Sequence, residues 1–294
     1  MRVALHALGI GHGARPEVVR AVARAAEEHG FARLWAGEHV VLVDAPVSRY
    51  PYSDDGRIAV PSDADWLDPL LTLSFAAAVT ERIGLATGVL LLPEHQPVVV
   101  AKQAATLDVL SAGRLTLGVG IGWSADEFAA LGVPFAGRGR RTEEYLAAMR
   151  AVWRDDVATF EGEFTRFRDI RVNPKPVRER RVPVVMGGNG DAALRRAVTL
   201  ADGWYGFNLS TAQALERAST LAGLCAERRR PTDALTVAVA LTDATPAVLP
   251  ELARAGVTEV VVVGAPPGTP DEAARWVGGL AAHWLNGGHS IKAT

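Results

Sequence analysis

The amino-acid sequence predicts an α/β protein built as a closed (β/α)8 barrel. Over 294 residues, eight short apolar segments that suit strands alternate strictly with eight segments that show helical spacing. Several strand segments are unbroken apolar runs, such as residues 259–263, as expected for parallel strands that are covered on both faces. No Pro/Ser-rich linker or charge block divides the chain, so we expect a single barrel domain over residues 1–294.

The first half of the chain contains four strand–helix units. The first helix begins at Pro16, carries apolar residues at helical spacing and ends near Gly30. Asp68 and Pro69 form a helix cap followed by proline at the first helical position. We expect strands at 3–8, 32–36, 83–92 and 114–119, helices at 16–30, 68–80, 98–110 and 141–153, a long loop at 40–66, and an irregular segment that includes 126–131.

The second half resumes the alternation after a polar excursion at 155–181, where Glu161-Gly162-Glu163 suggests a hairpin. Ser210 with Gln213, and Thr269 with Glu272, have the spacing of capping boxes, and each predicts a helix start. We expect strands at 182–186, 203–207, 235–241 and 258–263, and helices at 191–201, from 210 onward, at 246–255 and from 269 to about Asn286.

Composition excludes several classes of protein. Hydrophobic residues make up 49% of the chain, which excludes disorder as its main state. The 31 Lys and Arg against 33 Asp and Glu leave no basic excess for nucleic acid. Cys225 is the single cysteine, and no Cys/His group has zinc-ligand spacing, so we expect no metal site. With no signal-peptide pattern and no apolar run of about 20 residues, we expect a cytoplasmic protein without a membrane partner.

A glycine-rich turn supports a competing fold. Gly9, Gly11 and Ala14 match the G-x-G-x-x-A pattern of a dinucleotide-binding turn, and Glu38 follows the second strand. This interpretation predicts an NAD enzyme with an open, doubly wound sheet. We rank it second, because the motif is short and the eightfold alternation favours a barrel.

In a barrel, chemistry is expected where strands end at their C-terminal side. The second strand ends in Glu38-His39, which suits proton transfer or a structural ion pair. Gly88 interrupts an apolar strand, which suggests a bulge. The turn Gly187-Gly188-Asn189-Gly190 suits either phosphate binding at a helix N-terminus or a plain tight turn. His6 and His95 are isolated in the sequence, so neither receives a chemical role.

Taken together, these segments resemble the bacterial luciferase-like flavin and deazaflavin oxidoreductases, and more narrowly their coenzyme F420-dependent branch. The resemblance covers nearly the whole chain, and its specificity comes from the order and spacing of the motifs. The segments that carry it are Gly30 to His39, Arg82 to Val89, Leu110 to Leu115, Gly118 to Trp123, Asp126-Glu127-Phe128 and Gly187 to Trp204.

The resemblance implies a (β/α)8 barrel and a set of roles. It places His39, with Glu38, near the reactive ring of the cofactor, and it implies a non-prolyl cis peptide at Gly88-Val89 that backs the ring. It also implies that Ile121, Gly122 and Asp126 line the cofactor, and that Gly187, Gly188, Asn189 and Gly190 hold its phosphate.

Two positions depart from the family pattern. Trp123 stands where the sugar-phosphate dehydrogenase branch has a glutamate that donates a proton, which argues against that substrate and leaves the acid role open. Leu5-His6-Ala7 is less apolar and aromatic than expected for a first strand of this family.

The resemblance therefore implies an F420-dependent oxidoreductase that transfers a hydride to or from an unidentified small organic molecule. Trp66, Trp123 and Tyr50 are candidates for an apolar substrate wall. The alternatives are a monooxygenase that uses reduced FMN on the same fold, and a barrel that binds flavin without turnover. Barrels of this family often pair, so a homodimer is one option, and the sequence leaves the oligomeric state open.

Overall fold

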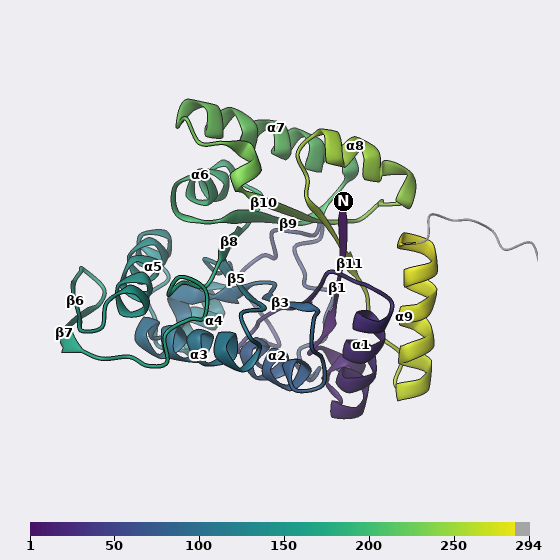
Figure 1. Cartoon of the computed structure of the whole chain (residues 1–294), viewed down its shortest axis with the longest axis horizontal. Helices are drawn as coiled ribbons and strands as arrows, with labels where there is room; N and C mark the ends of the chain where they lie inside the picture. Colours follow the sequence, from purple (N-terminus) through teal and green to yellow (C-terminus); the bar gives the residue numbers. More distant parts are fainter. Residues whose placement is uncertain (286–294) are drawn as a thin grey trace, which may run out of the picture.

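The computed structural model describes residues 1–285, which form a closed parallel barrel (Figure 1). The strand order is β3-β2-β1-β11-β10-β9-β8-β5-β4, and pairing of β3 with β5 closes the ring. β3 and β4 are two parts of the third barrel strand, so the ring has eight strands, as predicted. The strands are β1 (Arg2–Leu8), β2 (Arg33–Ala36), β3 (Gly84–Thr87), β4 (Leu90–Leu91), β5 (Leu115–Gly120), β8 (Val184–Gly187), β9 (Gly203–Leu209), β10 (Thr236–Leu241) and β11 (Glu259–Val263).

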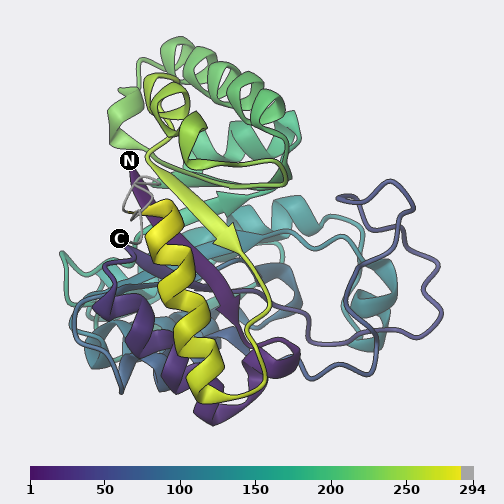
Figure 2. The same cartoon turned by 90° about the vertical axis from the view of Figure 1, so that its right-hand side faces the viewer.

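Helices surround the ring, and Figure 2 shows α9 beside α1 on one side of it. The 40–66 loop has no helix or strand and projects from another side of the molecule. The α-helices are α1 (Pro16–Glu28), α2 (Pro69–Ala77), α3 (Pro97–Leu110), α4 (Ala125–Ala130), α5 (Arg138–Arg154), α6 (Asp191–Leu200), α7 (Thr211–Glu227), α8 (Leu249–Arg254) and α9 (Pro270–Trp284). Residues 1–285 contain no helix that is both long and apolar enough to cross a bilayer.

Three of the predicted helix starts are confirmed by their caps. Asp68 Oδ1 accepts from the Leu71 amide at 2.8 Å, and Ser210 with Gln213 forms the complete capping box. At α9 the Thr269 hydroxyl receives the Glu272 amide at 3.4 Å but donates to the Glu272 carboxylate at 2.6 Å, so this box is only half formed. The expected helix end near Asn286 lies outside the described residues.

One local prediction is corrected and two are confirmed. The segment expected to be irregular contains α4, because Ser124 Oγ accepts from the Glu127 amide and caps a short helix. The third strand is interrupted at Gly88-Val89, and that peptide bond is cis, as the family resemblance implied. The hairpin expected in the polar excursion is confirmed as antiparallel β6 (Ala158–Glu161) and β7 (Arg166–Ile170).

The barrel interior is filled by two aromatic side chains among small ones. Trp35 and Tyr205 stack with ring centroids 4.4 Å apart, surrounded by alanines and valines that face inward from other strands. Below them, buried Glu259 accepts from Trp35 Nε1 at 3.0 Å and pairs with Arg33 at 3.0 Å. The lower barrel is therefore solid, and open space is left at the C-terminal ends of the strands.

The dinucleotide interpretation is wrong, because it requires an open sheet and the ring is closed. The glycines of that motif form a 3-10 turn, η1 (Gly11–Ala14), that leads from β1 into α1. Their conformational freedom shapes this connection: Gly9 and Gly11 both have positive φ angles, at 90° and 53°.

Candidate active site

A cavity of about 480 Å³ lies at the C-terminal ends of the barrel strands, and we name it the mouth cavity. Five glycines that lie at the ends of strands or directly after them line this cavity. These glycines are Gly37, Gly88, Gly120, Gly187 and Gly264. The side chains around them include His6, His39, Tyr50, Trp66, Val89, Trp123, Tyr205 and Phe207.

Val89, which follows the cis peptide bond after Gly88, forms part of the cavity floor. A Cβ atom at Gly120 would lie 2.7 Å from Val89 Cγ2, and one at Gly187 would lie 2.9 Å from Val89 Cγ1. Both separations are shorter than a van der Waals contact, so the Val89 side chain requires glycine at both positions. The result is a smooth apolar surface on which a flat ring system fits.

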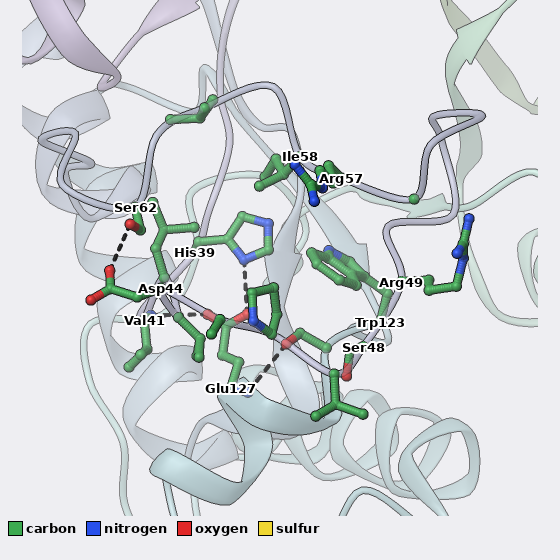
Figure 3. A pocket seen from close by; sticks show the side chains of 18 of the residues that line it. His39, Val41, Asp44, Ser48, Arg49, Arg57, Ile58, Ser62, Trp123 and Glu127 are labelled. Carbon is green, nitrogen blue, oxygen red and sulfur yellow. Dashed lines mark hydrogen bonds and ion pairs between the residues drawn. The ribbon is translucent and has the colours of Figure 1, made fainter.

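His39 is held at the cavity wall by a buried carboxylate. Its Nδ1 lies 2.8 Å from Glu127 Oε2, and the other carboxylate oxygen accepts from the amides of Val40 and Val41 at 2.7 and 3.0 Å. A carboxylate oxygen only accepts, so Nδ1 carries a proton, and in the neutral ring Nε2 is the nitrogen with the lone pair. In Figure 3 this second nitrogen points away from Glu127, on the side of Arg57 and Ile58.

The expectation that Glu38 adjusts His39 directly is corrected. Adjacent residues leaving a strand project to opposite sides, and Glu38 points away from His39. Its carboxylate accepts from the Leu91 amide at 2.5 Å and pairs with His95 Nε2 at 3.0 Å. Burial alone would lower the pKa of His95, but the hydrogen bond and charge of Glu38 outweigh it and raise that pKa. Glu38 therefore anchors the chain around β4, and it is also one of the residues that line the mouth cavity.

Glu94 is a third buried acid behind the cavity wall. Neither of its carboxyl oxygens has a hydrogen-bond partner among the described residues. A Cβ atom at Gly122 would lie 3.0 Å from Glu94 Oε1, so the carboxyl packs against the backbone of a cavity-lining residue. Burial, followed by the negative charges of Glu127 and Glu38, raises the pKa of Glu94 to about 9. Glu94 is therefore a neutral acid at pH 7.

The glycine turn after β8 reaches the cavity with its first half only. Gly187 and Gly188 line the mouth cavity, whereas Asn189 uses its amide group to bind the backbone of Phe207, at 2.7 and 3.1 Å. Gly190 is the N-cap of α6, where no side chain caps the first turn and nothing lies within 4 Å of an added Cβ. The uncapped amides at this helix start suit an anion, as predicted for a phosphate.

Asp126 does not line the mouth cavity, and its expected contact with a cofactor stays a prediction. Its carboxylate accepts from the Ser48 amide at 2.8 Å, and this hydrogen bond, the largest of several causes, lowers the pKa of Asp126. Ser48 Oγ in turn accepts from the Ala125 amide at 2.8 Å. These two contacts fasten the 40–66 loop to α4, which also carries Glu127.

The three aromatic residues expected at a substrate wall all line the mouth cavity. Trp66 and Trp123 lie edge-on to His39, with centroids 4.9 and 5.7 Å away, and Tyr50 lies 5.2 Å from Trp123. Trp66 Nε1 donates to the Gly37 carbonyl at 3.0 Å, which fixes the indole at the strand end. Ile121 and Gly122 also line this cavity, and their expected contact with a cofactor stays a prediction.

A second cavity of about 750 Å³, which we name the loop cavity, lies beneath residues 41–62 of the long loop (Figure 3). His39 and Trp123 line both cavities and form part of the wall between them. Arg57 also lines both, so a cationic side chain is present where the two spaces meet. A molecule that enters under the loop would thus meet His39 before the barrel mouth.

Sequence reasoning missed three groups that the fold brings to the mouth. Glu127 has the spacing of a capping box with Ser124, which explains its presence without a link to His39. Glu94 follows an ordinary proline, and His6 looked isolated because its partner, Tyr205, is 199 residues away. The inward alternation of β1 was the available signal for His6.

A family model described as luciferase-like monooxygenase matches residues 3–278. An uncharacterized protein of Mycobacterium tuberculosis is 39% identical over 267 residues, which cover 89% of this chain and 92% of that protein. An FMNH2-dependent dimethylsulfone monooxygenase of Pseudomonas putida is 33% identical over 164 residues, covering 54% of this chain and 45% of the relative.

Among solved structures, the coenzyme F420-dependent tetrahydromethanopterin reductase of Methanopyrus kandleri has the same fold, with a TM-score of 0.73. The similarity covers 97% of this chain and 99% of the reductase at 16% sequence identity, so it supports the architecture alone.

Proposed function

The chain belongs to the luciferase-like monooxygenase family, and from this premise we propose that it is a coenzyme F420-dependent oxidoreductase. In this proposal it transfers a hydride between the deazaflavin and a small organic substrate. The observation that carries the proposal is His39, held by Glu127 at the wall of an apolar, glycine-lined cavity. A positioned base beside a flat ring surface suits removal of a proton from a hydroxyl group while a hydride leaves its carbon.

The residues present fit a tricyclic, phosphate-bearing cofactor. The mouth cavity of about 480 Å³ falls within the usual range for small-molecule sites. Val89 with its flanking glycines provides a support for the ring, and the uncapped start of α6 beside Gly187 and Gly188 provides amides for a phosphate. When bound, the deazaflavin supplies the two-electron hydride chemistry.

The chain's own residues manage the proton. His39 Nε2 receives it from the substrate hydroxyl, and the negative charge of Glu127 stabilises the imidazolium that forms. Because Glu127 also holds the amides of Val40 and Val41, the ring keeps one orientation throughout. Trp66, Trp123 and Tyr50 exclude water and provide apolar contacts for the substrate.

A monooxygenase that uses reduced FMN is the second candidate, and the sequence identity to the FMNH2-dependent dimethylsulfone monooxygenase favours it. The two candidates share the fold and the cavity but differ in their reaction with oxygen. Reduced FMN activates oxygen, whereas the reduced deazaflavin reacts with it poorly. A third candidate, a barrel that binds flavin without turnover, predicts binding alone.

The test is a fluorescence titration of the purified protein with coenzyme F420, FMN and NADPH, side by side. We expect saturable binding of F420, weaker binding of FMN and none of NADPH. Preferred FMN binding, with oxygen consumption once the flavin is reduced, would support the monooxygenase. If neither F420 nor FMN binds, the proposed function is wrong.

The proton role is tested with His39→Ala and Glu127→Gln once a substrate is found. His39→Ala should lower kcat at least a hundredfold while cofactor affinity changes little, because general-base catalysis contributes about 10²–10⁴-fold. Glu127→Gln should also lower kcat, since it removes the charge that stabilises the imidazolium. Equal kcat in His39→Ala and the wild type would remove His39 from the mechanism.

A further inference from the structure

His6 is a polar side chain on the floor of the mouth cavity, and it takes no part in the proposed proton transfer. It lies on β1, where Ala4 faces the barrel interior, and the strand alternation turns His6 inward one layer nearer the mouth. Its imidazole packs directly below two of the strand-end glycines. A Cβ atom at Gly88 would lie 3.2 Å from His6 Cε1, and one at Gly37 would lie 3.2 Å from His6 Nε2.

The two ring nitrogens of His6 have different surroundings. Nδ1 lies 3.3 Å from the hydroxyl of Tyr205, which is held in place by stacking on Trp35. Nε2 has no partner within residues 1–285, but it is also not among the side-chain atoms that are sealed from solvent. Since His6 lines the mouth cavity, Nε2 opens into that space.

The charge states of this pair are fixed by burial. Desolvation lowers the pKa of His6 to about 4, so the imidazole is neutral at physiological pH. Burial likewise raises the pKa of Tyr205, so its hydroxyl keeps its proton. A neutral imidazole that accepts a hydrogen bond at one nitrogen donates at the other.

We propose that the Tyr205 hydroxyl donates to His6 Nδ1, and that His6 Nε2–H donates a hydrogen bond to a carbonyl oxygen on the ring of the bound cofactor. His6 is then a cofactor-binding residue on the barrel floor, and Tyr205 is the positioning residue that sets its tautomer. This inference rests on the proposed function, because it requires a ring with carbonyl groups above Gly88. Deazaflavin and flavin rings both carry such carbonyls, so the contact serves either cofactor.

An unmatched donor at the bottom of an apolar pocket is selective. A ligand without an acceptor at this point would displace water from Nε2 without replacing its hydrogen bond. The buried N–H group would then be unpaired, which lowers the affinity. A ligand with a carbonyl there replaces the water at little cost. The pair therefore favours rings that present a carbonyl over equally flat apolar rings.

The experiment measures the dissociation constants of F420 and FMN by fluorescence titration for the wild type and four variants. His6→Phe keeps a flat side chain without a donor, and we expect affinity for the cofactor that binds the wild type to fall about five- to tenfold. His6→Gln returns an amide donor and should recover most of the loss. Tyr205→Phe removes one oxygen and should lower affinity about two- to fivefold, whereas His283→Phe, on the exposed surface, should change nothing.

Because His6 stays neutral, the wild-type affinity should not change between pH 6 and pH 8 on its account. If a folded His6→Phe variant binds the cofactor within twofold of the wild-type affinity, the inference is overturned, but the proposed function is not. If His6→Phe does not fold, wild-type affinity in Tyr205→Phe would overturn it instead. Absence of binding by the wild type would overturn both the proposed function and this inference.

Discussion

Replacement of Glu94 by glutamine tests whether a neutral acid stands behind the cavity wall. Burial raises the pKa of Glu94 to about 9, so the folded protein keeps a proton that the unfolded chain loses above about pH 4.5. Raising the pH therefore lowers the free energy of the unfolded state relative to the folded state. As a result, the free energy of unfolding of the wild type falls between about pH 4.5 and pH 9. Glu94→Gln has no proton to lose and avoids this fall.

The magnitude follows from the pKa shift. Each pH unit between the unfolded pKa of about 4.5 and the folded pKa of about 9 is worth about 1.36 kcal/mol, so the ceiling at pH 8 is roughly 5 kcal/mol. We expect about half of that, near 2.4 kcal/mol at pH 8, since relaxation and water entry lower the cost of a buried charge. At pH 5 the loss of stability is less than about 1 kcal/mol, because most of the pH range between the unfolded and the folded pKa lies above pH 5.

The assay is thermal unfolding of both proteins at pH 5 and pH 8. With an unfolding entropy of roughly 0.6 kcal/mol/K for a chain of this length, the extra 2 kcal/mol corresponds to about 3–4 °C. The Tm of Glu94→Gln relative to the wild type should rise by that amount from pH 5 to pH 8. Glu28→Gln, at an exposed position, is the matched control and should show no such rise. If both variants behave alike, Glu94 is ionised or paired and the reasoning is refuted.

Two further predictions concern the cofactor phosphate and the assembly of the chain. Gly190→Asp should raise Tm slightly, because aspartate is a good N-cap for α6, yet weaken FMN binding more than tenfold by repelling its phosphate. Riboflavin, which has no phosphate, should bind this variant as it binds the wild type, and equal losses for both ligands would contradict the phosphate site. We also propose that the chain forms a homodimer through α2, which is apolar on its outer face with Leu71 70% and Phe75 37% exposed. Leu71→Glu should convert a dimer to a monomer in light scattering, and a monomeric wild type would contradict this assembly.

The features that the sequence predicted well are local in the chain. The eight strands and most helix starts follow from apolar runs, prolines and capping residues such as Asp68 and Ser210, each of which acts within four residues. The interruption at Gly88-Val89 and the strand-end position of His39 were also predicted, because a family resemblance and barrel geometry both point to strand ends.

The features that it missed depend on contacts between distant segments. Glu127 meets His39 across 88 residues, whereas the adjacent Glu38 turns to the opposite side and binds His95. Asp126 accepts from the Ser48 amide across 78 residues, a contact that no local pattern indicates. No local pattern encodes which of several carboxylates will face a given histidine, since that choice is made by tertiary packing.

The central claim is that the glycine-lined mouth above Val89 holds a tricyclic redox cofactor. A crystal structure of the protein grown with F420 or FMN tests it most directly. We expect the ring against Val89 and Gly122, its phosphate at the start of α6, and a ring carbonyl within hydrogen-bond distance of His6 Nε2. A ring bound elsewhere, or a mouth cavity filled by a different class of ligand, would contradict this claim.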